Sequence, residues 1–479
     1  MNPLDIHVFG NEPWWVVLIK VVLVFVLLLV VTIFNVWYER RLVGKMQHRL
    51  GPIMNGPGGL GQALADGAKL IFKEDFRPAG TDKWIFNIAP MLTGVAAFTS
   101  WSVIPLAGRV PLPVFNWSLL RFEAEPYYTP LQVTDLPVAV LFVLAIASIG
   151  IYGIVLAGWA SSSTYSLLGG LRATAQMISY EIAMGLSLVA VFLYSQSMST
   201  SAIVDAQQQP ILANVPFLSA LEIPGWYSLL LLPSCIVYMI AMVAECNRAP
   251  FDLVECEQEL VSGFLTDYSG FRYAIYFLAE YINMATVSAV ATTLFFGGYH
   301  IMWPFSWVAA HVPGMAWLDS GWMGVVWFLG KVLLFIAWFV WLRGTLPRFK
   351  YDQLMDLGWK VLLPVSLAWI VLVAVLRTAM RGGGNTLLLV LGGFFLLALA
   401  WFVISWLRDR GAPDEDEDQG EMSRSVAYEQ GEFDPFAGGY PVPPMPGQVI
   451  PELAGVLRGS ADTSRTAADT TPMSEKEHI

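Results

Sequence analysis

Four ionisable side chains lie inside apolar stretches of the sequence, where a charge is costly. They are Glu181, Glu245, Glu280 and Lys331. A charge inside a membrane helix costs about 3 kcal/mol or more unless it is paired or hydrated, so each is a functional candidate. Burial favours the neutral form of a carboxyl group and a nearby ammonium favours the charged form, so acids at graded depths could relay protons. The alternative is that they form isolated salt bridges that fix helix packing.

A dense acidic segment follows Glu245. Its charged residues are Arg248, Asp252, Glu255, Glu257 and Glu259. If this segment is helical, Glu255 and Glu259 share a face and repel each other, so the acids should titrate as a coupled set. An ordinary solvated loop would more often mix its charges, although a solvated acidic face is the other interpretation.

Residues 58–73 have the pattern of a helix that lies in the membrane surface. Leu60, Leu64 and Ile71 fall on one helical face, and the lysines lie elsewhere. The pattern predicts an amphipathic interfacial helix. Because it carries Asp66, this helix could form the lip of an opening for a lipid-soluble substrate, or it could serve only as a surface anchor.

Long apolar runs are the elements that must position these residues. A bilayer core about 30 Å thick needs roughly 20 apolar residues in one helix, and this chain is 56% hydrophobic and only 14% charged. Because hydrocarbon leaves no backbone group unpaired, such runs predict an all-α, polytopic transmembrane helix bundle. The nine approximate spans are Trp15–Tyr38, Trp84–Leu106, Leu136–Trp159, Gln176–Ser195, Trp226–Ala244, Phe271–Phe296, Trp322–Leu342, Trp359–Leu376 and Thr386–Leu407.

Basic residues predict the orientation of the bundle. Eight Lys or Arg residues lie between positions 40 and 83, and three follow the seventh span at 343–350. The segments between spans four and five and between spans six and seven have no Lys or Arg. Because loops rich in Lys and Arg face the cytoplasm, we expect the N-terminus outside and the C-terminus inside the cell.

The composition of the chain changes at Gly411. The segment 411–479 holds fourteen acids and four basic residues, a net charge of −10 that accounts for nearly all of the formal −11 of the chain. Low-complexity acidic sequence of this kind is typical of disorder. We therefore expect a membrane core at 1–376, an additional transmembrane helix within 377–410 and a disordered cytoplasmic tail at 411–479.

The chain lacks the usual sequence signs of a redox centre. Cys235, Cys246 and Cys256 have no CxxC spacing, which argues against an iron–sulfur cluster or a structural zinc in this chain alone. No glycine-rich dinucleotide fingerprint follows a strand, so we expect neither NADH nor flavin to bind here. We expect redox centres in partner subunits, the lipid bilayer as surroundings, and no nucleic acid as a partner.

Several long motifs occur in one order between residues 14 and 375. They are Glu39-Arg40-Arg41 with Gln47, Arg49, Gly51 and Pro52; Ala65-Asp66-Gly67 with Lys69; Leu168 to Ala173 and Gln176 to Glu181; Ala244 to Leu253; Glu259 to Gly263; Tyr268 to Gly270; Phe277 to Tyr281; and Pro347-Arg348 with Asp352 to Met355. In these motifs the chain resembles the family of H subunits of bacterial NADH:quinone oxidoreductase, respiratory complex I.

The resemblance implies a quinone chamber shared with a peripheral subunit that carries the terminal iron–sulfur cluster. The chamber walls on this chain would be the first loop, the first and sixth spans and the loop after span five. Family positions near the chamber or its arginine-rich support are matched by Arg40, Arg49, Asp66, Arg248, Asp252 and Arg348. A family carboxylate chain leading into the membrane is matched by Glu181, Glu245, Glu255, Glu257, Glu259 and Glu280. No motif covers Lys331. We expect it to belong to one hydrated path with Glu280, on a neighbouring helix, and to draw protons inward from the carboxylates; the alternative is that it pairs with an acid of a partner subunit.

Four places depart from the family pattern. Ile53-Met54 stands where Asn-Arg usually follows Gly-Pro, Val254 replaces Pro, Cys256 replaces Ala and Asp267 replaces Glu. The carboxylates remain in place, but the surroundings of the expected chamber change.

Together these observations predict a subunit of a redox-driven proton translocase that is not catalytic alone. The quinone, menaquinone or ubiquinone, would be a substrate, and the charge change on its reduction would pass to the carboxylates. The expected partners are peripheral iron–sulfur and quinone-site subunits and small and antiporter-like membrane subunits, in the inner (plasma) membrane. The alternatives are the homologous ion-coupling subunit of a membrane-bound hydrogenase and an independent secondary transporter, although no repeated pair of broken helices supports the transporter.

Overall fold

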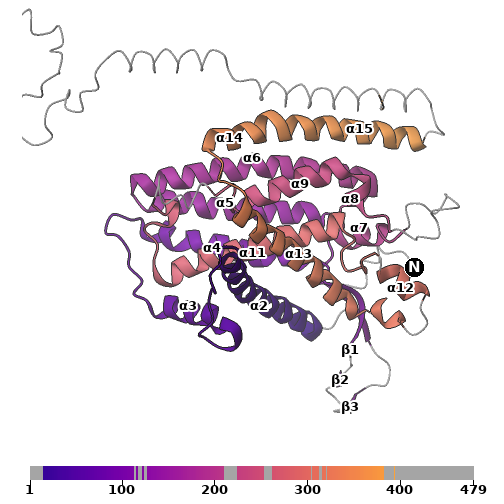
Figure 1. The fold of residues 1–479 in the computed structure, drawn as a ribbon, viewed down its shortest axis with the longest axis horizontal. Coiled ribbons are helices and arrows are strands. Elements are labelled where there is room, and N and C mark those ends of the chain that lie inside the picture. The colour runs from indigo at the N-terminus through magenta and orange to yellow at the C-terminus, as the bar shows by residue number, and fades with distance from the viewer. Residues whose placement is uncertain are drawn as a thin grey trace, which may run out of the picture. The chain divides into compact units, whose positions relative to one another are not determined.

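The chain forms a bundle of long helices with a small β-hairpin at one end (Figure 1). This computed structural model describes residues 14–112, 115–116, 121–122, 127–209, 224–252, 261–303, 305–311, 315–319 and 321–381, together with Gly393. The chain divides into two units, and all of these residues belong to the first, Met1–Leu396. The predicted ninth span and the acidic tail lie outside the described residues.

Helices occupy each of the first eight predicted spans. The long helices are α2 (Trp14–Met46), α4 (Lys83–Thr99), α5 (Ala139–Ala160), α6 (Thr164–Ser195), α9 (Leu232–Glu245), α11 (Gly270–Phe295), α13 (Met323–Thr345) and α15 (Leu363–Arg381). In the described part of the chain, six helical stretches are long and apolar enough to cross a membrane, and one of them is Tyr351–Thr378, which includes most of α15. The shorter α4 and α9 have 17 and 14 residues.

Short elements connect the long helices. They are η1 (Pro57–Gly59), α3 (Gly61–Phe72), η2 (Ser100–Val103), α7 (Thr200–Ala206), α8 (Tyr227–Leu230), η4 (Gly263–Leu265), α12 (Phe305–His311), η5 (Ala316–Asp319), α14 (Tyr351–Asp356) and the π-helix η6 (Leu357–Leu362). The strands, which were not predicted from the sequence, are β1 (Ala107–Leu112), β2 (Phe115–Asn116), β3 (Arg121–Phe122) and β4 (Tyr127–Leu131). Strands β1 and β4 pair antiparallel with Val110 opposite Thr129, and β2 pairs with β3. The fold class remains all-α, as predicted.

Several helix ends differ from the predicted spans, most clearly those of α2 and α6. Helix α2 continues to Met46, beyond the predicted end at Tyr38, and α6 already begins at Thr164 instead of Gln176. The predictions followed hydrophobicity, which ends at the lipid boundary, whereas a helix continues wherever its residues favour helix and nothing breaks it. Helix α2 stops only shortly before His48, whose φ is 56°.

Small residues allow α4, α5 and α6 to pack closely. A Cβ at Gly153 of α5 would lie 2.1 Å from the Thr93 hydroxyl oxygen of α4. A Cβ at Gly158 would lie 3.2 Å from the Cα of Gly170 on α6. Close backbone approach through small residues is the usual way in which membrane helices associate, because lipid gives no hydrophobic driving force between them.

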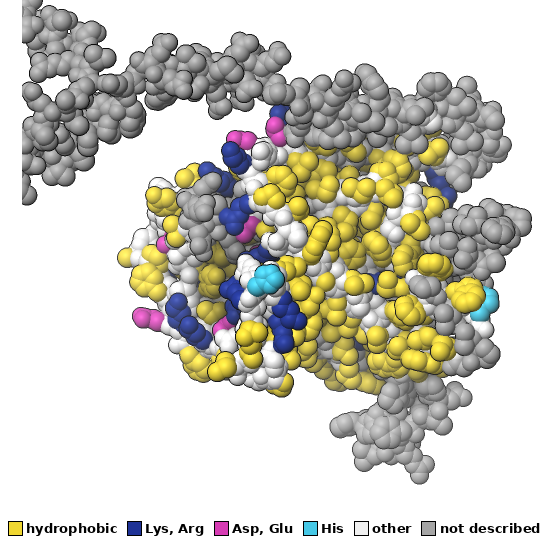
Figure 2. All heavy atoms as spheres, in the orientation of Figure 1, with side chains coloured by type: hydrophobic (Ala, Val, Ile, Leu, Met, Phe, Trp, Pro, Cys, Tyr) yellow, Lys and Arg dark blue, Asp and Glu magenta, His cyan; other side chains and the backbone are white. Residues whose placement is uncertain are grey.

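The surface separates into an apolar belt and a charged end. Figure 2 shows hydrophobic side chains over most of one face, with Lys and Arg gathered where α2 and α13 end and where α3 lies. We call this the basic end. Large apolar side chains on α2, such as Leu18, Val22 and Phe25, are about half exposed, as expected for a surface that meets lipid or another membrane subunit. The chain is therefore a multi-pass membrane protein.

Candidate functional site

A polar cavity of about 1270 Å³ opens at the basic end. We call it the basic-end cavity. Its walls come from α2, the segment after α2, α11, α13 and the residues that flank 253–260. The lining residues are Glu39, Arg40, Val43, Met46, Gln47, Arg49, Gly51, Pro52, Arg248, Val261, Ser262, Tyr273, Phe277, Tyr281, Arg343 and Gly344. Three candidates from the sequence, Arg40, Arg49 and Arg248, are thus brought to one cavity, whereas Glu255, Glu257 and Glu259 lie outside the described residues.

Glu39 is the central anion of the basic-end cavity. Its carboxylate is buried, and its Oε2 accepts a hydrogen bond of 2.6 Å from the Tyr281 hydroxyl. Its Oε1 accepts a hydrogen bond from Arg343 and lies 3.7 Å from Nη1 of Arg248. The Arg248 guanidinium also lies over the Tyr281 ring, 4.4 Å from its centroid. Charge-assisted bonds of this kind are stronger than neutral ones, so one carboxylate holds two guanidiniums in the cavity wall.

Glu39 was not predicted as a site residue, although it stands in one of the motifs, and Arg343 served only to predict the orientation. Because the predicted first span ended at Tyr38, Glu39 was treated as part of a loop. The signal that could have found it is helical periodicity. Leu28, Thr32, Asn35 and Glu39 are spaced by four, three and four residues, which places them on one face of α2, and all four are buried.

Arg40 and Asp66 form an ion pair that ties α2 to α3 beside the basic-end cavity. Gln62, one turn earlier on α3, donates to the second Asp66 oxygen at 2.9 Å. Arg40 lines the cavity and Asp66 does not. The predicted interfacial helix is confirmed as a helix, and Leu64 and Ile71 on its apolar face are about 60% exposed. Helix α3 therefore presents an apolar face next to an ion pair at the rim of the cavity.

Asp252 and Arg348 support the wall from outside. Arg348 Nη2 lies 3.5 Å from an Asp252 oxygen, and neither residue lines the basic-end cavity. The Phe349 backbone N–H donates to the Pro250 carbonyl at 3.0 Å, and the Phe349 ring stacks on Phe251. The chain after α13 is thereby fastened to the chain after α9, close to Arg248.

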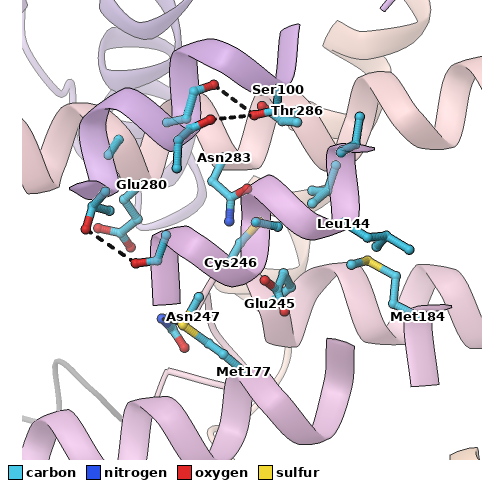
Figure 3. Close-up of a pocket in the computed structure, with 18 of the residues that line it drawn as sticks. Ser100, Leu144, Met177, Met184, Glu245, Cys246, Asn247, Glu280, Asn283 and Thr286 are labelled. Atoms are coloured by element: carbon cyan, nitrogen blue, oxygen red, sulfur yellow. Dashed lines mark hydrogen bonds between the residues drawn. The ribbon is translucent and has the colours of Figure 1, made fainter. Parts of the chain in front are cut away.

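A second cavity, of about 100 Å³, lies among α4, α5, α6, α9 and α11 (Figure 3). We call it the internal cavity. Glu245 and Glu280 line it. Glu245 is 1% exposed, and neither of its carboxyl oxygens has a hydrogen-bond partner in the described chain. A buried carboxyl group without partners is costly, so this group needs a proton or water inside the cavity.

Arg248 connects the two cavities. Its Nη1 faces Glu39 in the basic-end cavity, and its Nε lies 3.5 Å from Oε1 of Glu280, which lines the internal cavity. Glu181 lies beyond the internal cavity lining and accepts a hydrogen bond from Ser148 of α5. Glu181 and Glu245 are close enough to repel each other when both are charged. The structure thus brings Glu39, Glu280, Glu245 and Glu181 into one series.

The structure does not place Lys331 in this series, contrary to the expectation that it shares one hydrated path with Glu280. Its ammonium group donates to the carbonyls of Phe296, Gly298 and His300 at 2.7, 2.9 and 2.7 Å. Phe296, the C-cap of α11, and Glu280 are sixteen residues apart, about 24 Å at 1.5 Å per residue. The carbonyls at a helix C-terminus lack intrahelical donors and attract cations, so Lys331 caps the end of α11 that is far from Glu280.

We therefore expect Lys331→Met to weaken the protein rather than its proton coupling. Three carbonyls, one of them buried and two partly buried, would lose their donor, and an unsatisfied buried group costs about 1–3 kcal/mol. The assembled complex should be half-inactivated at a lower temperature, with an unchanged ratio of protons pumped to NADH oxidised before heating. Leu334→Met, at an exposed position of the same helix, is the control. If the Lys331→Met complex is as stable as the wild type but does not pump protons, Lys331 takes part in the proton path.

Residues 19–374 match the sequence model of the family described as NADH dehydrogenase. The chain belongs to the NADH dehydrogenase family. It is 52% identical over 469 residues to the H subunit of NADH-quinone oxidoreductase from Cutibacterium acnes, an alignment that covers 97% of this chain and 98% of that protein. It is 46% identical over 454 residues to the protein of the same name from Streptomyces avermitilis, with 94% and 91% covered. The resemblance found in the motifs is confirmed.

The part of the chain after residue 374 lies outside the NADH dehydrogenase family match. Both relatives nevertheless align with nearly all of this chain, so most of 375–479 has a counterpart in each of them. The extra segment is thus shared with these relatives rather than peculiar to this member of the family. Among the residues that the structure describes, no group of three or more His, Cys, Asp or Glu side chains could hold a metal ion.

Proposed function

We propose that this chain acts as the H subunit of a NADH:quinone oxidoreductase, forms one side of the quinone chamber, and passes the charge change at the quinone to buried carboxylates. The observation that carries this proposal is the contact of Arg248 with Glu39 in the basic-end cavity and with Glu280 in the internal cavity. The relatives are named as quinone oxidoreductase subunits, so a membrane-bound hydrogenase and an independent transporter are not favoured.

The basic-end cavity suits a quinone head group. Tyr273, Phe277 and Tyr281 of α11 offer aromatic faces to the ring, and Arg40 and Arg49 offer hydrogen-bond donors to its oxygens. Binding sites for small molecules usually combine an apolar lining with a few placed polar groups. Guanidiniums also stabilise the negative charge that develops on a quinone oxygen when a partner's iron–sulfur cluster reduces it.

The charge change at the quinone would reach the carboxylates through Arg248. A negative quinone oxygen attracts Arg248 toward the basic-end cavity and weakens its interaction with Glu280. A carboxylate that loses a cationic neighbour binds a proton more tightly. Glu280 would then take up a proton and pass it to Glu245 and Glu181. The acids Glu255, Glu257 and Glu259 are proposed members of the same relay.

The proposal also assigns an orientation and a setting. The basic end would face the cytoplasm, where the peripheral iron–sulfur and quinone-site subunits close the basic-end cavity. Small and antiporter-like membrane subunits would cover part of the apolar belt in the inner (plasma) membrane. The eight-helix core at 1–376 would carry the function, and 377–410 and the acidic tail at 411–479 would be additions to it.

Purification of the tagged chain in mild detergent tests the proposed assembly. We expect flavin-containing, iron–sulfur and antiporter-like subunits to co-purify with it and the preparation to reduce quinone with NADH. A hydrogenase large subunit in their place, or a chain that transports ions alone, would overturn the proposal.

We predict that Asp66→Asn slows quinone reduction and leaves NADH oxidation by ferricyanide unchanged. The Arg40–Asp66 pair is partly exposed, and such pairs contribute less than about 1 kcal/mol to stability, so the complex should assemble normally. Loss of the pair would free α3 at the rim and raise the KM for quinone more than it lowers kcat. Unchanged quinone kinetics in the assembled complex would show that this pair does not border the entrance.

A further inference from the structure

We propose that the internal cavity holds a cluster of ordered waters and that Asn283 positions these waters so that a proton can pass between Glu280 and Glu245. This inference rests on the proposed carboxylate path and adds to it a positioning residue that does not itself ionise. The carboxylate path needs a residue that positions water, because the carboxyl groups of Glu245 and Glu280 line the same cavity without a direct hydrogen bond.

The gap between the carboxyl groups is set by the helices that carry them. Glu245 is the last residue of α9, and Glu280 lies in the first half of α11. Because Glu245 has no hydrogen-bond partner in the described chain, it is not bonded to Glu280. Glu280 is held toward the basic-end cavity by Arg248. Among the residues that the structure describes, the direct way for a proton between the two carboxyl groups leads through the internal cavity, which both of them line.

Asn283 lies beside this gap. It follows Glu280 by three residues on α11, so the two side chains share a helical face. Figure 3 shows its amide directed toward Cys246, the residue next to Glu245. Asn283 lines the internal cavity, and its side chain makes no hydrogen bond with the described part of the chain.

Thr286 lines the same cavity but is already engaged in hydrogen bonds. Its hydroxyl donates to the Ile282 carbonyl at 2.8 Å and accepts from the Trp101 indole N–H at 2.7 Å. The Thr286 hydroxyl has already used its one donor and one of its two acceptor sites, so it cannot donate to a water, whereas the amide of Asn283 can both donate and accept.

Asn247 also lines the internal cavity and its Oδ1 has no partner in the described chain, but its amide nitrogen donates to the Met177 sulfur. Asn283 is therefore a lining group that can still both donate to water and accept from it on the helical face of Glu280.

The size and chemistry of the internal cavity fit a few water molecules. A buried water needs about 10–15 Å³ of accessible volume and two to four polar partners, and the cavity offers about 100 Å³. Glu245, Glu280 and Asn283 supply the polar partners on one side. Leu144 and Met184 form part of an apolar lining, which would confine the waters to the gap between the acids.

The proposed step conserves protons and involves no electron transfer. The protonated carboxyl group of Glu280 loses its O–H proton to the nearest water, and each water passes one proton to the next. The last water gives a proton to the carboxylate of Glu245. Asn283 holds the chain by donating to one water and accepting from another, and its own bonds are unchanged when the transfer is complete.

The test compares Asn283→Val with Asn283→Thr in the intact complex in inverted membrane vesicles. The two replacements have nearly the same shape, but only Thr can hydrogen-bond to water. We expect Val to lower the rate of proton pumping coupled to NADH oxidation by at least about tenfold, within the range that a placed proton-transfer group contributes. Thr should retain most of that rate, and both variants should oxidise NADH with ferricyanide normally.

Two controls separate this inference from the proposed function. Thr292→Val changes a buried residue of the same helix that does not line the internal cavity, and it should pump normally. Glu280→Gln tests the carboxylate path itself. If Glu280→Gln stops pumping while Asn283→Val and Asn283→Thr pump protons at the same rate, the proposed role of Asn283 and its waters is wrong. The carboxylate path is then still supported. If Glu280→Gln also pumps normally, the proposed path is wrong and this inference fails with it.

A second measurement needs no variant. A map of the wild-type complex at a resolution that shows water should contain density within hydrogen-bond reach of the Asn283 amide and of a Glu245 oxygen. An internal cavity that is empty in such a map would overturn the proposal even if Asn283→Val fails to assemble.

Discussion

Replacing Glu39 with Gln is expected to lower NADH:quinone reductase activity about 100-fold, because an uncompensated buried charge costs about 3–5 kcal/mol and each 1.4 kcal/mol is a factor of ten. The variant keeps the size of the side chain but leaves Arg248 and Arg343 without their shared anion. Both guanidiniums line the basic-end cavity and should then move apart. Activity should be measured with a short-chain quinone, and ferricyanide reduction shows that the peripheral subunits still work.

A matched control for Glu39→Gln is available at the same end of the bundle. Asp75 pairs with Arg272 at 3.2 Å, but its side chain is 39% exposed. Exposed pairs contribute little, so Asp75→Asn should leave quinone reduction nearly unchanged. The double variant Glu39→Gln with Arg343→Gln should recover part of the loss, because it removes one of the two cations that had shared the Glu39 carboxylate. Normal quinone kinetics in Glu39→Gln would exclude the cluster from the chamber.

The second large effect is expected at Glu245. Glu245→Gln keeps the shape of the side chain, and because the carboxyl group has no partner in the described chain, the complex should assemble fully. A Gln side chain cannot carry the proton, so coupled pumping should fall at least about tenfold, consistent with the loss of a proton-transfer group. The ratio of protons moved to NADH oxidised in vesicles measures this effect.

Glu74→Gln serves as the control for Glu245. Glu74 is an exposed acid at the basic end and lines neither of the two cavities, so its replacement should not alter the ratio. A Glu245→Gln complex that assembles and pumps at the normal ratio would show that protons do not pass through the internal cavity.

The bundle is well predicted from the sequence because hydrocarbon imposes a strict rule on the backbone. Any long apolar run must close its own hydrogen bonds, and the first eight spans are helical in the structure for that reason. The rule says nothing about where a helix ends in water. The predictions were therefore wrong at the C-terminal end of α2 and at the N-terminal end of α6. The hairpin formed by β1 and β4 was missed because a segment that connects two spans outside the hydrocarbon carries no such constraint.

The candidate site was predicted in part, and the errors have physical causes. Arg40, Arg49 and Arg248 were found because family motifs mark them, and the structure gathers them at one cavity. Glu39 was missed because its span was predicted to end at Tyr38, whereas the helix continues to Met46. Lys331 was misplaced because depth along its own helix does not reveal which end of the neighbouring helix it meets, and three carbonyls at the end of α11 are its partners.

Arg248 lies between two acids, and the coupling that we propose through it must work in both directions. Any linkage that lets a reduced quinone favour protonation of Glu280 must, by the same free energy, let protonated Glu280 favour the reduced quinone. A large electrochemical proton gradient that changes how often Glu280 is protonated would then change how tightly the quinone and its reduced form are bound. In the proposed path the guanidinium of Arg248 joins the quinone to the row of acids, so a large proton gradient would slow respiration at the step of quinone reduction.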